Sequence, residues 1–231
     1  MSADARPGAK PRIPRLRNGQ RLTRTEFMRR WEAMPELKHA ERIEGKVSIM
    51  TPPISLDHSD PHSFLIWCLM TYRMATPGVR SLNESTVHID GDNDLQPDTG
   101  LFIDPDNGGQ TRYAGGYLEG APEFVVEIAE STVRKDLGTK FEIYRRAGVL
   151  GYLVWQTKKK TIICFVNREG QFERVEPVDG VFKSSCFPGL WIDVSALLAS
   201  DLDKVQTTLA GGLADPSHAK FKRKLAKARK G

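Results

Sequence analysis

The sequence lacks the features that would place it in a membrane, secreted or nucleotide-binding class. No apolar run in its 231 residues approaches the roughly 18 that a membrane helix needs. The basic N-terminus has no apolar stretch of the kind that marks a secretion signal. There is also no glycine-rich phosphate loop. We therefore expect no membrane contact and a cytoplasmic location.

Cysteine is scarce, and this excludes two further classes. The three cysteines, Cys68, Cys164 and Cys186, are far apart, odd in number and without CxxC spacing. Each has apolar neighbours, so we interpret them as buried free thiols and expect neither a disulfide framework nor a zinc site. The segment Asp90–Asp94 resembles the start of a calcium loop, but Leu95 and Leu101 stand where the loop needs glycine and glutamate.

Charge is divided unevenly along the chain. Residues 1–24 carry seven Lys or Arg against one acid, and residues 216–231 carry seven with no acid. Residues 25–215 therefore hold 20 basic and 28 acidic groups, so an acidic core lies between two basic ends. Basic ends favour a polyanionic partner, most commonly nucleic acid, although a merely solvated tail is the alternative. The candidate contacts are Arg12, Arg15, Arg17, Lys222, Arg223 and Lys224.

Periodicity and turn residues predict one mixed α/β domain between two tails. We expect a basic disordered tail over 1–21, a folded domain over 22–205 and a basic C-terminal tail over 206–231. Helices are predicted at 25–34, 57–75, 134–147 and from 193. A hairpin is predicted at 41–50, and strands at 85–89, 98–103, 124–129, 151–156, 161–166, 171–175 and 180–185.

One carboxylate stands inside an apolar strand. In the stretch EFVVEIAE, alternation places Phe124, Val126 and Ile128 on one face and Val125, Glu127 and Ala129 on the other. Such a run is typical of a strand covered on both sides. An unpaired carboxylate there is costly, so Glu127 should be paired, metal-bound or protonated.

Two more charged residues, Asp98 and Lys140, are candidates for the same site as Glu127. Asp98 directly follows Pro97 at the start of another apolar strand, and Lys140 lies on the helix after Glu127, with Tyr144 on the same helical face. If the two strands are neighbours, Asp98 and Glu127 converge and need a cation, for which Mg²⁺ is suited. The alternatives are an Asp that caps a turn, a Glu paired with a structural Lys or Arg, and a solvated Lys.

At these residues the chain resembles a known family. The segments Gln96-Pro-Asp98, Glu123–Ile128 and Asp136–Val149 resemble the PD-(D/E)xK restriction-endonuclease-like superfamily, and more closely its Uma-type family of restriction endonucleases. The resemblance covers roughly residues 22–198, with further matches at 22–27, 41–45, 187–190 and 194–198 and at His58.

The resemblance implies a fold and a site. The fold is an αβββαβ restriction-endonuclease-like core with a mixed central sheet flanked by helices and extra C-terminal strands. Asp98 and Glu127 would be metal ligands for Mg²⁺ or Mn²⁺, Glu41 the auxiliary acid and Lys140 the lysine. In most of the superfamily that lysine lies two residues after the glutamate, where this chain has Ala129, so Lys140 must reach over from the helix. The segment 130–132 is also one residue shorter than is usual in the family.

The resemblance implies a Mg²⁺-dependent endonuclease that hydrolyses phosphodiester bonds of DNA. Two hypotheses from other classes remain: a non-catalytic nucleic-acid-binding or regulatory protein on a nuclease scaffold, and a structural role in an assembly, since folds of this kind are often homodimers. The distance between Lys140 and the carboxylates distinguishes the endonuclease from the non-catalytic binding protein.

Overall fold

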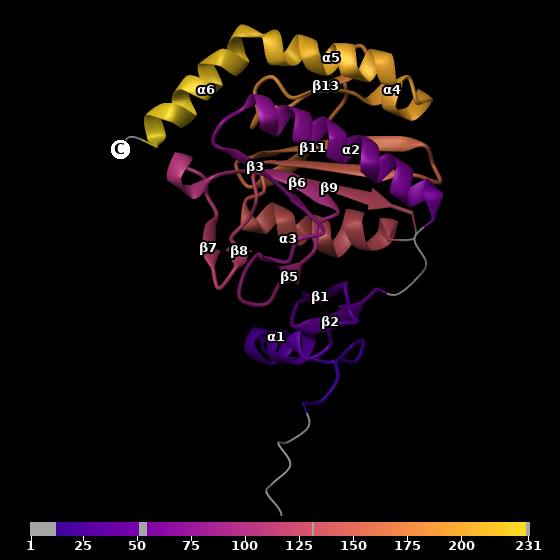
Figure 1. Ribbon diagram of the computed structural model, residues 1–231. Helices are drawn as coiled ribbons and strands as arrows, with labels where there is room; N and C mark the ends of the chain where they lie inside the picture. The colour runs from indigo at the N-terminus through magenta and orange to yellow at the C-terminus, as the bar shows by residue number, and fades with distance from the viewer. Residues whose placement is uncertain (1–12, 51–54, 131, 230–231) are drawn as a thin grey trace, which may run out of the picture.

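The computed structural model describes residues 13–50, 55–130 and 132–229 (Figure 1). The helices are α1 (Arg24–Glu32), α2 (Leu56–Ala75), α3 (Lys140–Ala147), α4 (Val194–Ala199), α5 (Leu202–Ala214) and α6 (Pro216–Ala228), with short helical turns η1 (Pro105–Asn107) and η2 (Lys135–Thr139). The strands are β1 (Ala40–Ile43), β2 (Lys46–Ile49), β3 (Val79–Asn83), β4 (Val87–His88), β5 (Asp94–Leu95), β6 (Thr99–Ile103), β7 (Arg112–Ala114), β8 (Tyr117–Glu119), β9 (Phe124–Ala129), β10 (Gly151–Gln156), β11 (Thr161–Arg168), β12 (Gln171–Val175), β13 (Val181–Lys183) and β14 (Trp191–Asp193).

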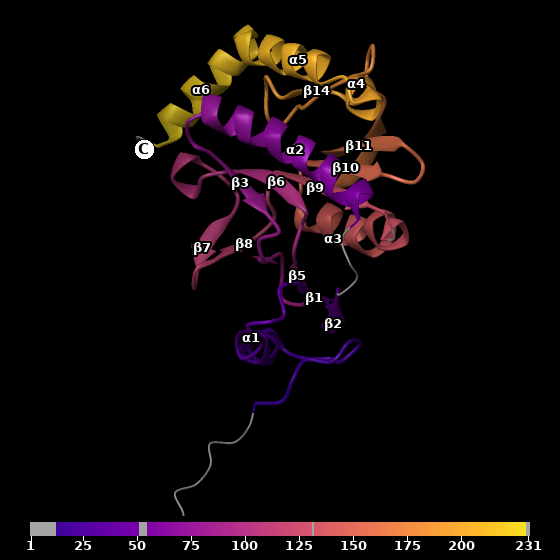
Figure 2. The ribbon, with the colours of Figure 1, turned by 45° about the vertical axis from the view of Figure 1, so that its right-hand side comes forward.

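The central sheet has the strand order β12-β11-β10-β9-β6-β3. Strand β9 runs parallel to β10 and antiparallel to β6, and β6 is antiparallel to β3. Helix α2 covers one face of this sheet and α3 the other (Figures 1 and 2). The succession α2-β3-β6-β9-α3-β10 is the αβββαβ arrangement, which confirms the predicted fold class, and β11 to β14 are the extra C-terminal strands.

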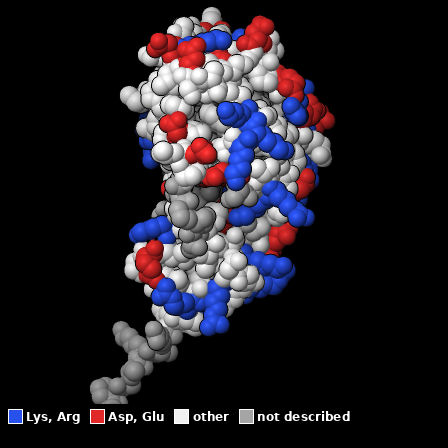
Figure 3. Space-filling view, turned by 90° about the vertical axis from the view of Figure 1, so that its right-hand side faces the viewer, with Lys and Arg blue, Asp and Glu red and all other residues white. Residues whose placement is uncertain are grey.

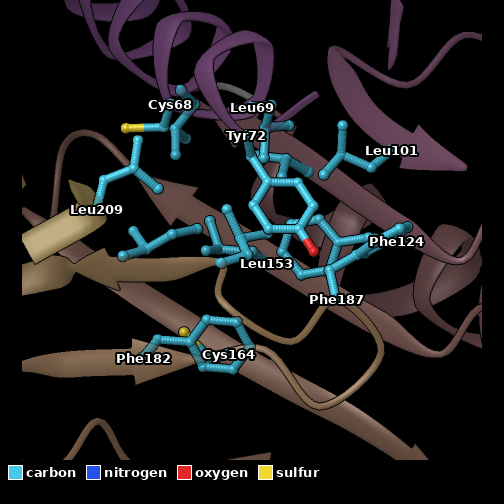
Figure 4. Packing of buried hydrophobic residues seen from close by; sticks show 14 of the residues in the cluster. Cys68, Leu69, Tyr72, Leu101, Phe124, Leu153, Cys164, Phe182, Phe187 and Leu209 are labelled. Atoms are coloured by element: carbon cyan, nitrogen blue, oxygen red, sulfur yellow. The ribbon is translucent and has the colours of Figure 1, made fainter. Parts of the chain in front are cut away.

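Strand β9 is buried along its whole length because both of its faces are covered. Phe124, Val126 and Ile128 pack with α2 and the C-terminal helices in the larger core (Figure 4). Val125 and Ala129 pack with α3 in a second core on the other face. The predicted alternation is therefore confirmed, and Glu127 faces α3.

A second sheet, in the order β2-β1-β5-β4-β8-β7, carries the N-terminal part of the chain. Buried charges hold it together around Asp94, which is fully buried. Its carboxylate accepts hydrogen bonds from Arg42 Nε at 2.6 Å and Arg24 Nε at 2.8 Å, and His88 Nδ1 lies 2.8 Å away. Because Arg42 belongs to β1, this network fixes the strand that also bears Glu41.

The described parts of the two predicted tails belong to the fold. Instead of a tail from residue 206, the chain forms α5 and α6, each begun by an aspartate cap, Asp201 and Asp215. Leu209, Phe221 and Leu225 from these helices are buried in the larger core. In α6 the abundance of Lys and Arg obscured the spacing of Phe221 and Leu225, and the predicted boundary at 206 falls inside α5.

The N-terminal tail is also shorter than predicted. Residues 1–12, including Arg12, lie outside the described residues. Residues 13–21 lie against β2: Leu16 is buried, and the amide of Gly19 donates to the carbonyl of Val47 at 2.7 Å. Arg15 forms an ion pair with Glu36, whereas Arg17 is exposed. None of the helices in the described ranges combines the length and apolar character that crossing a membrane requires.

Docking of α6 can be tested through Phe221, whose side chain is buried in the larger core. We expect Phe221→Ala to lower the free energy of unfolding by about 3 kcal/mol, because it opens a cavity in a packed core. The matched change Lys224→Ala, on the exposed face of the same helix, should cost no more than about 0.5 kcal/mol. Urea unfolding measures both, and equal small losses would mean that α6 does not dock.

The Asp94 network predicts an acid-dependent contribution to stability. Burial alone would raise the pKa of Asp94, but His88, Arg42 and Arg24 outweigh it and hold this pKa below its ordinary value. A depressed pKa stabilises the fold above about pH 3.9, the unfolded value, and that contribution is lost as pH falls through the lower folded pKa.

Asp94→Asn removes the charge with little change in shape. We expect it to destabilise the protein at neutral pH by about 3–5 kcal/mol, since Arg42 is left buried without its partner. Its stability should also fall less steeply below about pH 4 than that of the parent protein. Unfolding free energies measured across this pH range give both results, and parallel curves would contradict the assignment.

Candidate active site

The candidate site lies where the two sheets meet. Asp98 immediately precedes β6, Glu127 lies in β9, and Lys140 is the first residue of α3. These three side chains and Asp136 of η2 line one cavity of about 330 Å³. Glu41 comes from β1 of the second sheet and reaches the same lysine. The structure thus brings together all four residues predicted for catalysis.

Lys140 is the centre of the site. Its Nζ lies 2.7 Å from Glu127 Oε1, 3.0 Å from Glu41 Oε1 and 3.9 Å from Asp136 Oδ1, and its side chain is only 3% exposed. Burial alone would lower the pKa of Lys140, but Glu127, Glu41 and Asp136 outweigh it and raise this pKa well above the ordinary value. The displaced lysine therefore does reach the carboxylates, and it does so as a buried ammonium ion.

Glu127 is held by two donors on one oxygen. Tyr144 donates from its hydroxyl to Oε1 at 2.8 Å, and Lys140 contacts the same atom. Burial raises the pKa of Glu127 well above its ordinary value, Lys140 opposes this, and the carboxylates of Asp98, Asp136 and Glu41 add to the rise. The cost of a carboxylate in this strand is thus offset by a lysine and a tyrosine from α3.

Asp98 is oriented by the neighbouring strand. Its Oδ2 accepts a hydrogen bond from the amide of Ile128 at 2.5 Å. His58, in the first turn of α2, has its Nε2 4.0 Å from Asp98 Oδ1. Burial raises the pKa of Asp98, while Lys140, the Ile128 amide and the two histidines His58 and His62 oppose the rise.

Glu41 is bound on both oxygens. Oε1 accepts from Lys140 and from the amide of Gln96 at 3.1 Å, and Oε2 accepts from Lys135 at 3.4 Å. Burial alone would raise the pKa of Glu41, but Lys140 and Lys135 together lower it. This carboxylate is the one that the site keeps most firmly ionised.

The sequence interpretation missed two residues of the site. Asp136 lies four residues before Lys140, a spacing that places both on one helical face and could have identified it. Its Oδ2 is buried without a hydrogen-bond partner. Lys135 points to Glu41, but nothing in its sequence context distinguishes it from an ordinary exposed lysine. His58, interpreted as a helix-start residue, lines the cavity.

The donors present fit a hard divalent cation. Four carboxyl groups (Glu41, Asp98, Glu127 and Asp136) face two lysines, so the acidic side chains outnumber the cations. Burial raises the pKa values of Asp98, Glu127 and Asp136, and this crowding adds to the rise at Glu127 and Asp136. Carboxylate oxygens are the ligands that Mg²⁺ and Mn²⁺ take, and the unpartnered Asp136 oxygen borders the cavity. Within the described ranges, no three His, Cys, Asp or Glu side chains already form a metal cluster, so the carboxylates would have to close around an ion.

The central mixed sheet flanked by helices, in the order αβββαβ, is a restriction-endonuclease-like fold. The family model described as "Putative restriction endonuclease" (Uma2) matches residues 25–195, and the chain belongs to this family. A crystal structure titled as a putative nuclease belonging to DUF820 from Anabaena variabilis has a similar fold, with a TM-score of 0.58 and 18% sequence identity. The match covers 74% of this chain and 97% of that one. No curated protein matches.

The buried lysine can be tested through stability. Lys140→Met leaves Glu127 and Glu41 without their shared partner, and we expect it to lower the free energy of unfolding by about 3–5 kcal/mol. Arg145→Met on the same helix removes a cation from the partly exposed pair with Glu142 and should cost less than about 1 kcal/mol. Urea denaturation compares the two, and similar losses would show that the buried cluster is not held by Lys140.

Proposed function

We propose that this protein is a nuclease that depends on Mg²⁺ or Mn²⁺ and hydrolyses phosphodiester bonds of DNA. The observation that carries the proposal is the contact of Lys140 with both Glu127 and Glu41, beside Asp98 in one cavity. The description of the family supports a nuclease function in general. The metal, the substrate and the roles of the residues are parts of the proposal.

The carboxylates of the site and the groups that orient them have separate roles. Asp98 and Glu127 would hold the cation, which, when bound, acidifies a water molecule and neutralises charge on the phosphate. The Ile128 amide and the Tyr144 hydroxyl orient these two carboxylates before any substrate arrives. Because these groups are already oriented, little reorganisation energy is needed when charge develops in the transition state.

Lys140 has a role that its contacts define. Its ammonium group contacts two carboxylates and favours their charged forms: it lowers the pKa of Glu41 and opposes the rise that burial causes in the pKa of Glu127. Lys135, whose side chain is 26% exposed and lines the same cavity, is the better placed of the two to meet an incoming phosphate oxygen. We assign charge balance to Lys140 and phosphate contact to Lys135.

A basic turn next to the end of β9 suits a phosphate backbone. Thr157, at the end of β10, donates its amide to the carbonyl of Ala129 at 3.2 Å, which ties the following turn to the end of β9. That turn is Lys158–Lys160, and all three lysines are exposed. Figure 3 views the molecule from the side on which β10 and β11 end in Figure 1, and Lys and Arg lie there interspersed with acidic groups.

A non-catalytic DNA-binding protein is the second candidate. The observation that favours it is the engagement of Lys140 and Glu41 with one another, together with the absence of a preformed three-ligand cluster among the described residues. A scaffold in which the lysine permanently occupies the centre of the carboxylates would bind DNA without turnover.

Cleavage of supercoiled plasmid distinguishes the two. With Mg²⁺ or Mn²⁺ we expect nicking or linearisation that a chelator abolishes. Asp98→Asn should reduce the rate by about 10²–10³-fold, because it removes a charge that the reacting phosphate and cation need. Asp203→Asn, an exposed acid of α5, is the matched control and should leave the rate unchanged.

Two other results would change the assignment. Equal rates for the parent and Asp98→Asn would mean that the activity comes from elsewhere. No cleavage by the parent, with salt-sensitive DNA binding that survives Asp98→Asn, would establish the non-catalytic alternative.

A further inference from the structure

Helix α6 is an addition to the family domain. It spans Pro216–Ala228, beyond the matched residues 25–195. The sequence from residue 216 onward has no acidic residue. The cations of the described part are Lys220, Lys222, Arg223, Lys224, Lys227 and Arg229. So much positive charge on one helix destabilises it by repulsion, unless a partner offsets it.

The helix is held firmly in spite of that repulsion. Phe221 and Leu225 are buried in the larger core, and His218 Nε2 lies 2.8 Å from Thr76 Oγ1 at the end of α2. Asn107 of η1 donates its side-chain amide to the carbonyl of Leu225 at 3.1 Å. The apolar face is thus fixed and the basic face has a defined position, beside the C-terminal end of α2 in both ribbon views.

One side of α6 forms a basic cleft. A cleft of about 640 Å³ has no acidic residue in its lining. It is lined by Lys222, Arg223, Ala226 and Arg229 together with Met74, Ala75, Pro77, Gly78 and Asn107. Within the described ranges, no carboxylate forms an ion pair with any of the six cations of α6. The other three, Lys220, Lys224 and Lys227, lie outside the cleft lining.

The cleft is separate from the candidate active site. His58 of that site lies in the first turn of α2, whereas Met74 of the cleft lies in the last. At 1.5 Å per residue, the two are about 24 Å apart along the helix. The cleft therefore takes no part in the chemistry of Asp98 and Glu127, and a duplex would need about seven base pairs to reach from one to the other.

We propose that this α6 cleft binds the phosphate backbone of double-stranded DNA. Three unpaired cations in a concave surface without acids complement a polymer that carries a charge every ~1.7 Å. A duplex is favoured over a single strand because the only aromatic residue of α6, Phe221, is buried and offers no base a stacking surface. The proposal rests on the proposed function for the identity of the polyanion, but not on cleavage.

Binding is measured by fluorescence anisotropy with a labelled duplex of about 30 base pairs over a range of salt concentrations. Asp98→Asn protein in the presence of chelator serves as the background, so that cleavage does not contribute. The cleft variant is Lys222→Ala/Arg223→Ala/Arg229→Ala, and the matched variant on the same helix is Lys220→Ala/Lys224→Ala/Lys227→Ala. Both variants remove three charges. Thermal melts are the control that checks whether each variant is folded.

We expect the cleft variant to bind more than about tenfold more weakly and to lower the slope of log affinity against log salt by about three, one for each lost phosphate contact. The matched variant should lose less than about threefold. Equal losses in the two variants, or none in either, overturn the cleft as a site. Preference of the parent for single-stranded DNA or for vesicles of anionic lipid overturns the assigned partner.

The two proposals fail in different ways. Cleavage by the parent with no effect of the cleft variant on duplex binding removes the α6 site and leaves the nuclease intact. No cleavage by the parent, with binding that depends on the cleft, supports the α6 site and removes only the nuclease.

Discussion

The buried ammonium group of Lys140 is the constraint on which the rest of the site depends. A lysine with 3% of its side chain exposed is tolerated only when opposite charges surround it, and Glu127 and Glu41 do so within 3.0 Å. The reverse is equally true, because each of these carboxylates would be destabilising in its strand without the lysine. No member of the cluster can be placed alone, so the fold has to assemble all of them at once.

That requirement explains why two sheets meet at this point. Glu127 comes from the central sheet, Glu41 from the N-terminal sheet and Lys140 from the helix packed between them. The N-terminal sheet is positioned by a second buried charge cluster around Asp94, whose partner Arg42 is the next residue after Glu41. The ion network around Asp94 therefore fixes strand β1 through Arg42. The ion network around Lys140 includes Glu41, the carboxylate that β1 carries. A change at Asp94 should be felt at Lys140 although the two do not touch.

The sequence predicts those residues of the site whose orientation depends on local periodicity. Alternation along β9 gives the face of Glu127, and helical spacing gives the face of Lys140, because both depend on near neighbours. The approach of Glu41 depends on how one sheet packs on the other, which no local pattern encodes; only the family resemblance indicated it. The sheet partner β3 (Val79–Asn83) and the strand β14 were missed because short strands between turns carry little pattern. Helix α6 was missed because its many cations hid the spacing of Phe221 and Leu225. Helix α5 has one Lys and no Arg, and it was missed although Val205 and Leu209 recur at helical spacing.

The distribution of charge now has a structural meaning. An acidic domain that concentrates carboxylates around a cavity repels a polyanion at long range, and a cation in the cavity offsets this only over a Debye length of about 8 Å in physiological salt. On the proposed function, the approach of DNA then needs attraction from elsewhere on the molecule. Helix α6 carries that charge beside the C-terminal end of α2, and Met74 of the α6 cleft lies about 24 Å along α2 from His58 of the cavity. This length along α2 exceeds the Debye length. On the proposed function, separation of α6 from the cavity lets one chain gather carboxylates at the candidate site and still attract a polyanionic substrate.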